Sequence, residues 1–399
     1  MKMKTIAETF KKIIHGVIPA ILLTLAVGSI YAFSLFVDPI STQIGVSREK
    51  IQIAFSLGIF FLGMGAAFFG PLVEKNIKIS TILGTIMFLL GLIVTQQAIL
   101  LKSILLLYIG YGVTVGTATG IIYISPVKTM MLWFRKNPGI ASAVSIISFG
   151  FGTSLCGLLF NWLYPIYGIQ LIFYALAFIY SIMMFIGSIF LKKPKYETTN
   201  ALKKKEHFSK WTFIKTDSWG RRAWLFMFLN ISAGLALIGC AASILKEIGC
   251  SNQMTILIVS LMGISNTAGR FGFAWIGDLL KDKRINLWMA IPIISIICIL
   301  PATISIKLIT ISLLLIPFLY GAGFSTCPSI LANKYGMTNI STIHGLILSA
   351  WGCAGLIGNQ ISTQLFKYTG SYDLLPIILI FIHIIVFFNS NIMRKDLGK

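Results

Sequence analysis

The stretch ISTILGTIMFLLGLIVTQQAILL, residues 79–101, contains no charged side chain. A helix of about 20 apolar residues is long enough to cross the roughly 30 Å hydrocarbon core of a bilayer. A short break at Lys102 and Ser103 follows, and a second apolar run then continues to residue 127. So short a break predicts two antiparallel membrane helices joined by a tight turn.

The rest of the chain has the same character. Of its 399 residues, 56% are hydrophobic and 11% are charged, against about a quarter charged in an ordinary soluble domain. This composition excludes a soluble enzyme and predicts an all-α membrane protein. We expect twelve transmembrane helices, at residues 14–37, 52–73, 79–101, 103–127, 138–163, 168–191, 221–245, 254–278, 285–306, 308–331, 340–366 and 371–393.

One long polar break, residues 192–220, separates six predicted spans from six more, and together with the adjoining Arg221 and Arg222 it carries ten basic residues. We interpret it as a cytoplasmic linker between an N-terminal half, residues 1–191, and a C-terminal half, residues 221–399. The halves repeat weakly, because a shift of 204 residues superposes Gly70 on Ala274 and Glu74 on Asp278. Such internal symmetry is typical of transporters that bind their substrate near the midplane of the membrane.

The charge of the chain predicts its orientation. It has 33 Lys and Arg against 12 Asp and Glu, a formal net charge of +21. Basic loops stay on the cytoplasmic side of a membrane. With the N-terminus inside, 26 basic residues fall in inner segments and 6 in outer loops. We therefore expect a multi-pass protein of the cell (inner or plasma) membrane with both termini in the cytoplasm, and no nucleic-acid partner.

The remaining basic residue, Arg270, falls inside a predicted span. It precedes Asp278 by eight residues, which places it about 12 Å from the end of the helix and near the middle of the membrane. All twelve acids lie in loops or at span ends. A charge in hydrocarbon marks a functional site, and a guanidinium matches a carboxylate through two parallel hydrogen bonds. We predict that Arg270 binds a carboxylate substrate; snorkelling toward Asp278 is the alternative.

Further substrate-binding candidates interrupt the apolar runs. Asn266 lies four residues before Arg270 and therefore on the same helix face. The others come from the first, second, fourth, tenth and eleventh spans, and they are Tyr31, Gln52, Tyr123, Tyr320 and Trp351. For each aromatic residue, ordinary packing between helices is the alternative.

The segment GPLVEKNIK, residues 70–78, resembles the loop signature of the major facilitator superfamily, G-x-L-x-D-R/K-x-G-R/K. Gly70 and Lys75 match the signature, Glu74 stands for its aspartate, and a fainter copy in the second half ends at Asp278. An acid at a helix end beside basic residues predicts a cytoplasmic charge latch that breaks when the halves rock. For Lys75, plain positive-inside bias is the alternative.

Four longer runs resemble the oxalate:formate antiporter family of that superfamily, at residues 31–41, 120–143, 228–237 and 266–278. The resemblance implies that the arginine of the eighth helix, here Arg270, binds the substrate carboxylate. It also implies that Tyr31 and Tyr123 line the cavity and that Gln52 and Asn266 are polar neighbours.

One position departs from this family. The oxalate exchanger has a second cation, a lysine in its eleventh helix, where this chain has Trp351. With one central positive charge, a dianion would bring an excess negative charge into a low-dielectric cavity, at a cost of several kcal/mol. A monocarboxylate balances Arg270 one to one.

We therefore predict a secondary transporter of small monocarboxylates, such as formate, lactate or pyruvate, that works by alternating access. The alternatives are an oxalate or dicarboxylate exchanger, a proton-linked symporter, a drug-type exporter and a transport-fold sensor that does not translocate. Antiport and proton symport stay open. The sequence shows no catalytic triad, no paired acids and no Cys/His cluster. It therefore predicts no enzyme, no cofactor and no metal site. The expected partners are a carboxylate anion and the lipid bilayer, and we expect a monomer.

Overall fold

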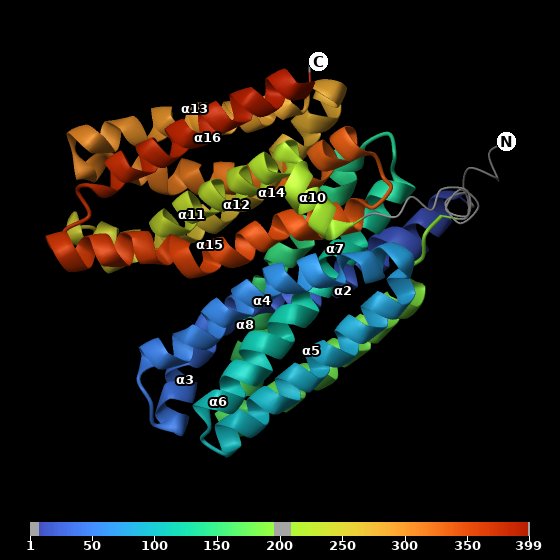
Figure 1. Ribbon diagram of the computed structural model, residues 1–399. Coiled ribbons are helices and arrows are strands. Elements are labelled where there is room, and N and C mark those ends of the chain that lie inside the picture. Colours follow the sequence, from blue (N-terminus) through green and yellow to red (C-terminus); the bar gives the residue numbers. More distant parts are fainter. Residues whose placement is uncertain (1–7, 195–208, 398–399) are drawn as a thin grey trace. The chain divides into compact units, whose positions relative to one another are not determined.

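The computed structural model describes residues 8–194 and 209–397 of the chain. In this part of the chain the secondary structure is helical, without strands (Figure 1). Eleven helical segments within it are long and apolar enough to cross a membrane. The prediction of an all-α membrane protein is confirmed.

The count of eleven, against twelve predicted spans, arises in α8, Pro138–Phe190. Its 53 residues hold both of the predicted spans 138–163 and 168–191. The helix is interrupted at Gly168, where φ is 58° and ψ is −172°. Glycine adopts a positive φ without the steric cost that a Cβ adds. The chain therefore changes direction at Gly168, so that α8 consists of two helices, one for each predicted span, that meet at this kink.

The chain forms two compact units. The first unit comprises the described residues up to 194 together with 337–352, and the second comprises 209–336 and 353–397. The predicted linker at 192–220 falls partly outside the described residues, at 195–208. Its described end carries the short helix α10, Lys210–Thr216.

The first unit contains α2 (Ile18–Gly28), α3 (Ser34–Ile44), α4 (Arg48–Lys75), α5 (Ile77–Leu100), α6 (Ile104–Leu107), α7 (Gly116–Trp133), α8 and the first residues of α15 (Ile340–Thr369). A π-helix at Ile13–Val17 precedes α2, a 3-10 helix at Ser29–Phe33 joins α2 to α3, and a π-helix at Tyr108–Val115 precedes α7. Within this unit α2 packs against α8, α4 packs against α7, and α5 runs beside α8 (Figure 1).

The second unit contains α10, α11 (Ser218–Glu247), α12 (Asn252–Leu280), α13 (Ile285–Ile304), α14 (Ile309–Tyr335), the rest of α15 and α16 (Leu375–Leu397). Short 3-10 helices at Lys281–Lys283 and Ile306–Leu308 connect α12 to α13 and α13 to α14. In this unit α12 packs against α14, and α13 runs beside α16 (Figure 1).

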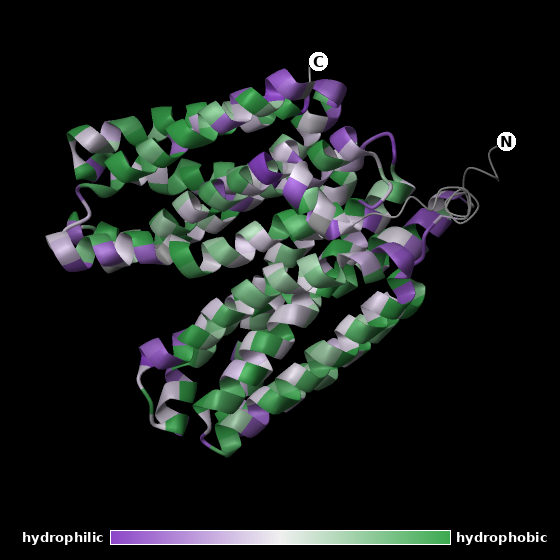
Figure 2. Cartoon of the chain, in the orientation of Figure 1, coloured by the Kyte–Doolittle hydropathy of each residue, from purple (hydrophilic) through white to green (hydrophobic). Residues whose placement is uncertain are grey.

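Hydrophobic residues cover the helices along their length, and hydrophilic residues gather at helix ends and connections (Figure 2). Large apolar side chains are exposed, for example Phe68 at 70% and Ile304 at 84%. In water such surfaces are unfavourable, whereas lipid accommodates apolar helices whose backbone groups are bonded internally. The protein is therefore an integral membrane protein.

Glycines bring the first residues of α15 close to α4 within the first unit. A Cβ at Gly70 would lie 2.7 Å from the Cα of Thr342, and one at Gly345 would lie 2.1 Å from the backbone oxygen of Ala66. Small residues allow membrane helices to approach until their backbones touch. Gly70, predicted as part of a latch, thus has a packing role that any side chain would disturb.

Candidate functional site

Arg270 lies on α12 and is directed into the second unit. It is only 7% exposed, although its neighbour Phe271 is largely exposed. The guanidinium carbon of Arg270 lies 5.9 Å from the ring centroid of Phe324 on α14. A cation above an aromatic ring gains about 0.5–2 kcal/mol. Phe324 therefore helps to hold the buried charge in place.

Asn266 lies beside Arg270, and Tyr320 lies beside Phe324. A Cβ at Gly321 would lie 2.3 Å from the backbone oxygen of Asn266 and 3.1 Å from the Cγ of Arg270. Asn266 and Arg270 therefore share the face of α12 that packs against α14, as their spacing of four predicts. The buried ring of Tyr320 has its centroid 5.1 Å from that of Phe324. We call Arg270, Asn266, Tyr320 and Phe324 the arginine cluster.

The first unit holds three of the other predicted residues in one aromatic cluster, which comprises Tyr31, Tyr123, Phe149 and Trp351. The ring of Trp351 on α15 lies 5.5 Å from Tyr123 on α7 and 6.3 Å from Tyr31. Phe149 on α8 lies within 5.8 Å of all three, mostly in edge-to-face geometry. Such pairs add about 0.5–1.5 kcal/mol each to the burial of their rings. Nothing in the sequence distinguishes Phe149 from the other 28 phenylalanines.

Gln52 lies apart from this cluster. It is the fifth residue of α4, and its side chain is exposed. Phe55, on the next turn, has its ring centroid 6.0 Å from that of Tyr31. Gln52 therefore lies one helical turn from a neighbour of the aromatic cluster, and its substrate-binding role stays a prediction.

Glu74, near the end of α4, is bound from three directions. Lys128 on α7 forms a salt bridge with its carboxylate. The backbone N–H of Ser341, at the start of α15, donates to Oε2 at 3.0 Å. Lys193, which follows α8, donates from Nζ to the backbone oxygen of Glu74 at 3.0 Å. A carboxylate at a helix N-terminus is favourable because exposed N–H groups carry partial positive charge. We call these four residues the Glu74 group.

Lys128 corrects the sequence-based topology. The predicted fourth span ends at residue 127 and leaves Lys128 in a loop, but α7 continues to Trp133 and Lys128 is 5% exposed. The salt bridge to Glu74 neutralises the charge and lets it remain inside the helical bundle. A second basic side chain, besides Arg270, therefore lies within a span.

The two other charged candidates for the latch are Lys75 and Asp278. Lys75 is exposed beside Glu74, whose carboxylate pairs with Lys128 in place of a loop cation. Asp278, at the end of α12, accepts from Nη2 of Arg284 at 3.4 Å, and both side chains are buried. Each unit thus has an ion pair at the end of the helix that carries the signature.

The titration of Lys193 gives a testable pH dependence outside the membrane-spanning segments. Burial lowers the pKa of its amino group, Lys128 also lowers it and Glu74 raises it, with the net result that the pKa of Lys193 is about 8. The folded pKa is below the unfolded one, so charged Lys193 costs stability below about pH 8, and this cost is lost as the pH rises toward the unfolded value. We expect acylation of Lys193, measured by mass spectrometry, to have its midpoint near pH 8.

Two variants check the cause of that shift. Glu74→Gln removes an attractive charge and should lower the midpoint, whereas Lys128→Met removes a repulsive charge and should raise it. A midpoint that stays unchanged in both variants would contradict the assignment of the shift to these two neighbours.

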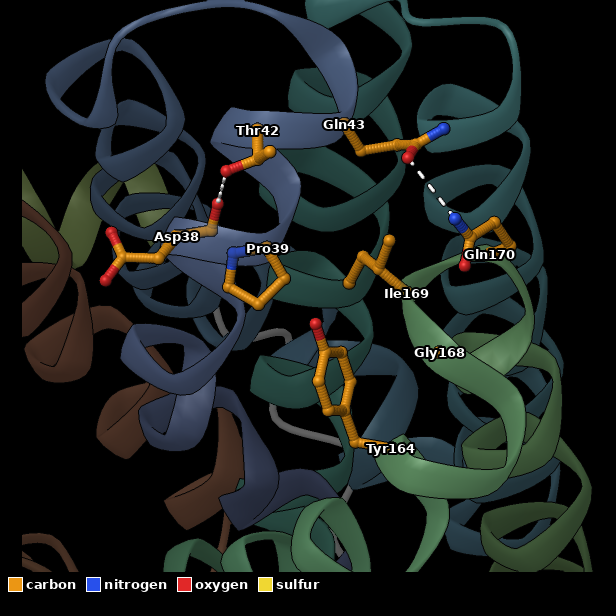
Figure 3. Close-up of a pocket in the computed structure, with 8 residues that line it drawn as sticks. All are labelled: Asp38, Pro39, Thr42, Gln43, Tyr164, Gly168, Ile169 and Gln170. Atoms are coloured by element: carbon orange, nitrogen blue, oxygen red, sulfur yellow. Dashed lines mark hydrogen bonds between the residues drawn. The ribbon is translucent and has the colours of Figure 1, made fainter.

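A pocket of about 500 Å³ lies in the first unit, between the second half of α3 and the kink of α8 at Gly168. Figure 3 shows its polar wall, where Gln170 donates to Gln43 at 3.3 Å and the hydroxyl of Thr42 donates to the backbone oxygen of Asp38 at 3.0 Å. Among the residues that line it, Asp38 is the charged one, and its carboxylate pairs with Arg48 at 2.8 Å. A carboxylate in the wall disfavours an anion, so this pocket is unsuited to a carboxylate substrate.

Long apolar helices, a twofold division of the chain and buried cations within spans define a membrane transporter, and comparison with known proteins specifies its class. The family model described as Major Facilitator Superfamily matches residues 18–386. The chain belongs to the major facilitator superfamily. It is a secondary transporter, a class of membrane carriers and not of enzymes.

Relatives and solved structures agree with this family. An Escherichia coli K12 protein described as the uncharacterized MFS-type transporter YhjX is 24% identical over 347 residues, which cover 85% of each chain. The oxalate:formate antiporter of Oxalobacter formigenes is 20% identical over 355 residues, which cover 88% of this chain and 84% of the antiporter.

Two solved transporters share the fold. The transporter FucP, a fucose:proton symporter of E. coli, superposes with a TM-score of 0.71 at 14% identity, over 94% of this chain and 97% of FucP. The proton:xylose symporter XylE superposes with a TM-score of 0.67 at 14% identity, over 96% and 95%. These similarities establish the fold. The substrate has to be inferred from the residues of the site.

Proposed function

We propose that this transporter moves small organic monocarboxylates and that Arg270 binds their carboxylate group. The burial of Arg270 within a membrane helix, against the ring of Phe324, is the observation that carries the proposal. A buried guanidinium binds a carboxylate through two parallel charge-assisted hydrogen bonds. The similarity to a protein named oxalate:formate antiporter supports a carboxylate substrate.

The charges favour a monoanion over a dianion. Lys128, the second basic residue found within a span, is paired with Glu74 and adds no net charge. Trp351, at the position where the resemblance expects a lysine, packs its ring against Tyr31 and Tyr123. One guanidinium then neutralises one carboxylate, whereas a second carboxylate would cost several kcal/mol in a low-dielectric site.

The proposal assigns the Glu74 group a role in the transport cycle. Transporters of this fold work by alternating access of a central site. Glu74, with Gly70 close against the start of α15, is proposed as a cytoplasmic charge latch, and Asp278 as its counterpart in the second unit. The partner that the signature predicts from the loop, Lys75, is replaced in this role by Lys128. We place both termini in the cytoplasm of a cell-membrane protein.

Uptake into proteoliposomes tests the substrate. Purified transporter is supplied with labelled formate, acetate, lactate, pyruvate and oxalate, and protein-free liposomes serve as the control. We expect saturable uptake of monocarboxylates, with oxalate transported at least about tenfold less efficiently because of its uncompensated charge. Counterflow with and without a pH gradient then separates anion exchange from proton symport.

Two outcomes would overturn the proposal. If oxalate were carried best, the charge argument would be wrong and a dicarboxylate exchanger would replace it. If no carboxylate were carried but an amphiphilic drug were, the chain would be an exporter, and binding without uptake would make it a sensor.

A further inference from the structure

His344, the fifth residue of α15, is a histidine buried within a membrane-spanning helix. The residue is 3% exposed. The centroid of its imidazole ring lies 6.4 Å from that of Tyr123, and among the residues that the structure describes the ring forms no hydrogen bond or ion pair. A buried polar group without a partner is unfavourable, and an ionisable side chain within a membrane helix indicates a functional site. The ring nitrogens of His344 therefore point to a ligand that a nitrogen atom can bind.

The other histidines that the structure describes are bonded through their rings. His383 on α16 is 2% exposed, and its Nδ1 donates to the backbone oxygen of Leu379 at 2.8 Å. Nδ1 of His15 bonds to the backbone oxygen of Phe190 at 3.1 Å. Such a bond holds the ring in one orientation and one tautomer. His344 lacks a bond of this kind, so a structural hydrogen bond does not explain its place in the span.

The helices around α15 in the first unit bring few charges to His344. The charges of α4 lie in its first and last turns, α7 carries Lys128, and α8 carries none. Titratable groups that contact the start of α15 are Tyr31, Tyr123 and Glu74, and Glu74 is paired with Lys128. An imidazole takes up a proton near neutral pH far more readily than a phenol. His344 is therefore the group of this set best suited to gain a proton.

His344 lies at a level between the Glu74 group and the aromatic cluster. The backbone N–H of Ser341, which donates to Glu74, is one helical turn before it, and Trp351 is two turns after it. The ring of Tyr123 on α7 lies 6.4 Å from that of His344 and 5.5 Å from that of Trp351. A proton on His344 would thus lie beside the aromatic residues that are predicted to line the cavity.

We propose that His344 is the proton-binding site of this transporter and that the monocarboxylate enters together with one proton. This inference rests on the proposed function of Arg270. A membrane potential that is negative inside opposes the entry of a monoanion, and one accompanying proton cancels that charge. The proton comes from the water outside, binds to the unprotonated ring nitrogen of the neutral imidazole, and leaves to the cytoplasm. The neutral ring is thereby restored in each cycle.

Uptake driven by a pH gradient and exchange at equal pH test this inference in proteoliposomes. Labelled formate, lactate and pyruvate are supplied with the outside one pH unit more acidic than the inside, and the initial rate is measured above that of protein-free liposomes. A pH indicator enclosed in the liposomes reports the protons that enter. His344→Gln and His344→Asn replace the ring with neutral amides of two lengths. His383→Gln is the matched control, because His383 is also a buried histidine but has a bonded ring.

A gradient of one pH unit is a tenfold difference in proton activity, so we expect it to raise the initial uptake rate of the wild type by about five- to tenfold. About one proton should enter for each labelled molecule, since one imidazole binds one proton. In both His344 variants this stimulation and the proton signal should disappear. Exchange of labelled for unlabelled substrate at equal pH moves no net proton, so it should persist in both variants. His383→Gln should behave like the wild type.

Three results would overturn the inference. The pH gradient would leave wild-type uptake unchanged while exchange proceeds, or it would still drive uptake in both His344 variants, or both variants would lose exchange and gradient-driven uptake together. The first result would make the chain an exchanger, the second would place the proton elsewhere, and the third would assign His344 to packing or substrate binding. Each of these leaves carboxylate transport by the wild type intact. A wild type that carries no carboxylate at all would instead refute the proposed function, and the role of His344 would fall with it.

Discussion

Replacing Arg270 with glutamine is expected to lower the transport efficiency for monocarboxylates by about a hundredfold or more. Loss of one partner from a buried, hydrogen-bonded charge pair costs about 2–5 kcal/mol, which corresponds to about 30-fold to several thousandfold. Glutamine keeps most of the volume beside Phe324 and removes the charge. The ratio of turnover rate to half-saturation concentration, measured for labelled substrate in proteoliposomes, reports the effect.

Two further variants make this result specific. Arg270→Lys keeps the charge but loses the planar fork, so we expect an intermediate loss of about tenfold. Arg221→Gln is the matched control, because Arg221 caps α10 by donating to the backbone oxygens of Ile214 and Lys215. It should change uptake by less than about twofold. Unreduced uptake by Arg270→Gln, with a normal melting temperature, would remove Arg270 from the substrate site.

Glu74→Gln is expected to destabilise the protein by about 3 kcal/mol or more, because it leaves the charge of Lys128 buried without its counter-ion. Lys128→Met should cost less, since the Glu74 carboxylate is partly exposed and still accepts from the Ser341 N–H. The double variant should recover most of the loss, because no charge is then buried unpaired. Thermal unfolding in detergent measures all four proteins as a double-mutant cycle.

The same cycle separates stability from gating. A double variant with restored stability and impaired transport supports the charge latch, whereas restoration of both assigns the pair to stability alone. Lys75→Gln is the control, because Lys75 is adjacent but exposed. Additive effects of the two single variants would contradict an interaction between Glu74 and Lys128.

Features that depend on short-range pattern were predictable from the chain. Runs of apolar residues are visible directly because a membrane helix makes its backbone hydrogen bonds within itself. Arg270 was recognisable because a charge stands out in an apolar run, and its shared face with Asn266 follows from the period of one helix. The fold prediction was confirmed by the structure and by the family.

Features that depend on contacts between helices were not predictable from the sequence. Lys128 was assigned to a loop because its partner, Glu74, is 54 residues away and only their contact makes burial of the lysine favourable. Asn230 looks like any polar residue in a span, and only the packing of α11 on α14 shows that its side chain is buried against Gly323.

The sequence by itself therefore determined the membrane environment, the helices and the intramembrane charge of Arg270. Each of these follows from the free energy of transferring the side chains of one helix into lipid. Only the tertiary structure decided which groups meet. The grouping of Tyr31, Tyr123 and Trp351, and the three donors around Glu74, require helices that are distant in sequence to pack side by side. That packing depends on close contacts such as those at Gly70 and Gly345. A local sequence pattern does not predict which helices make such contacts.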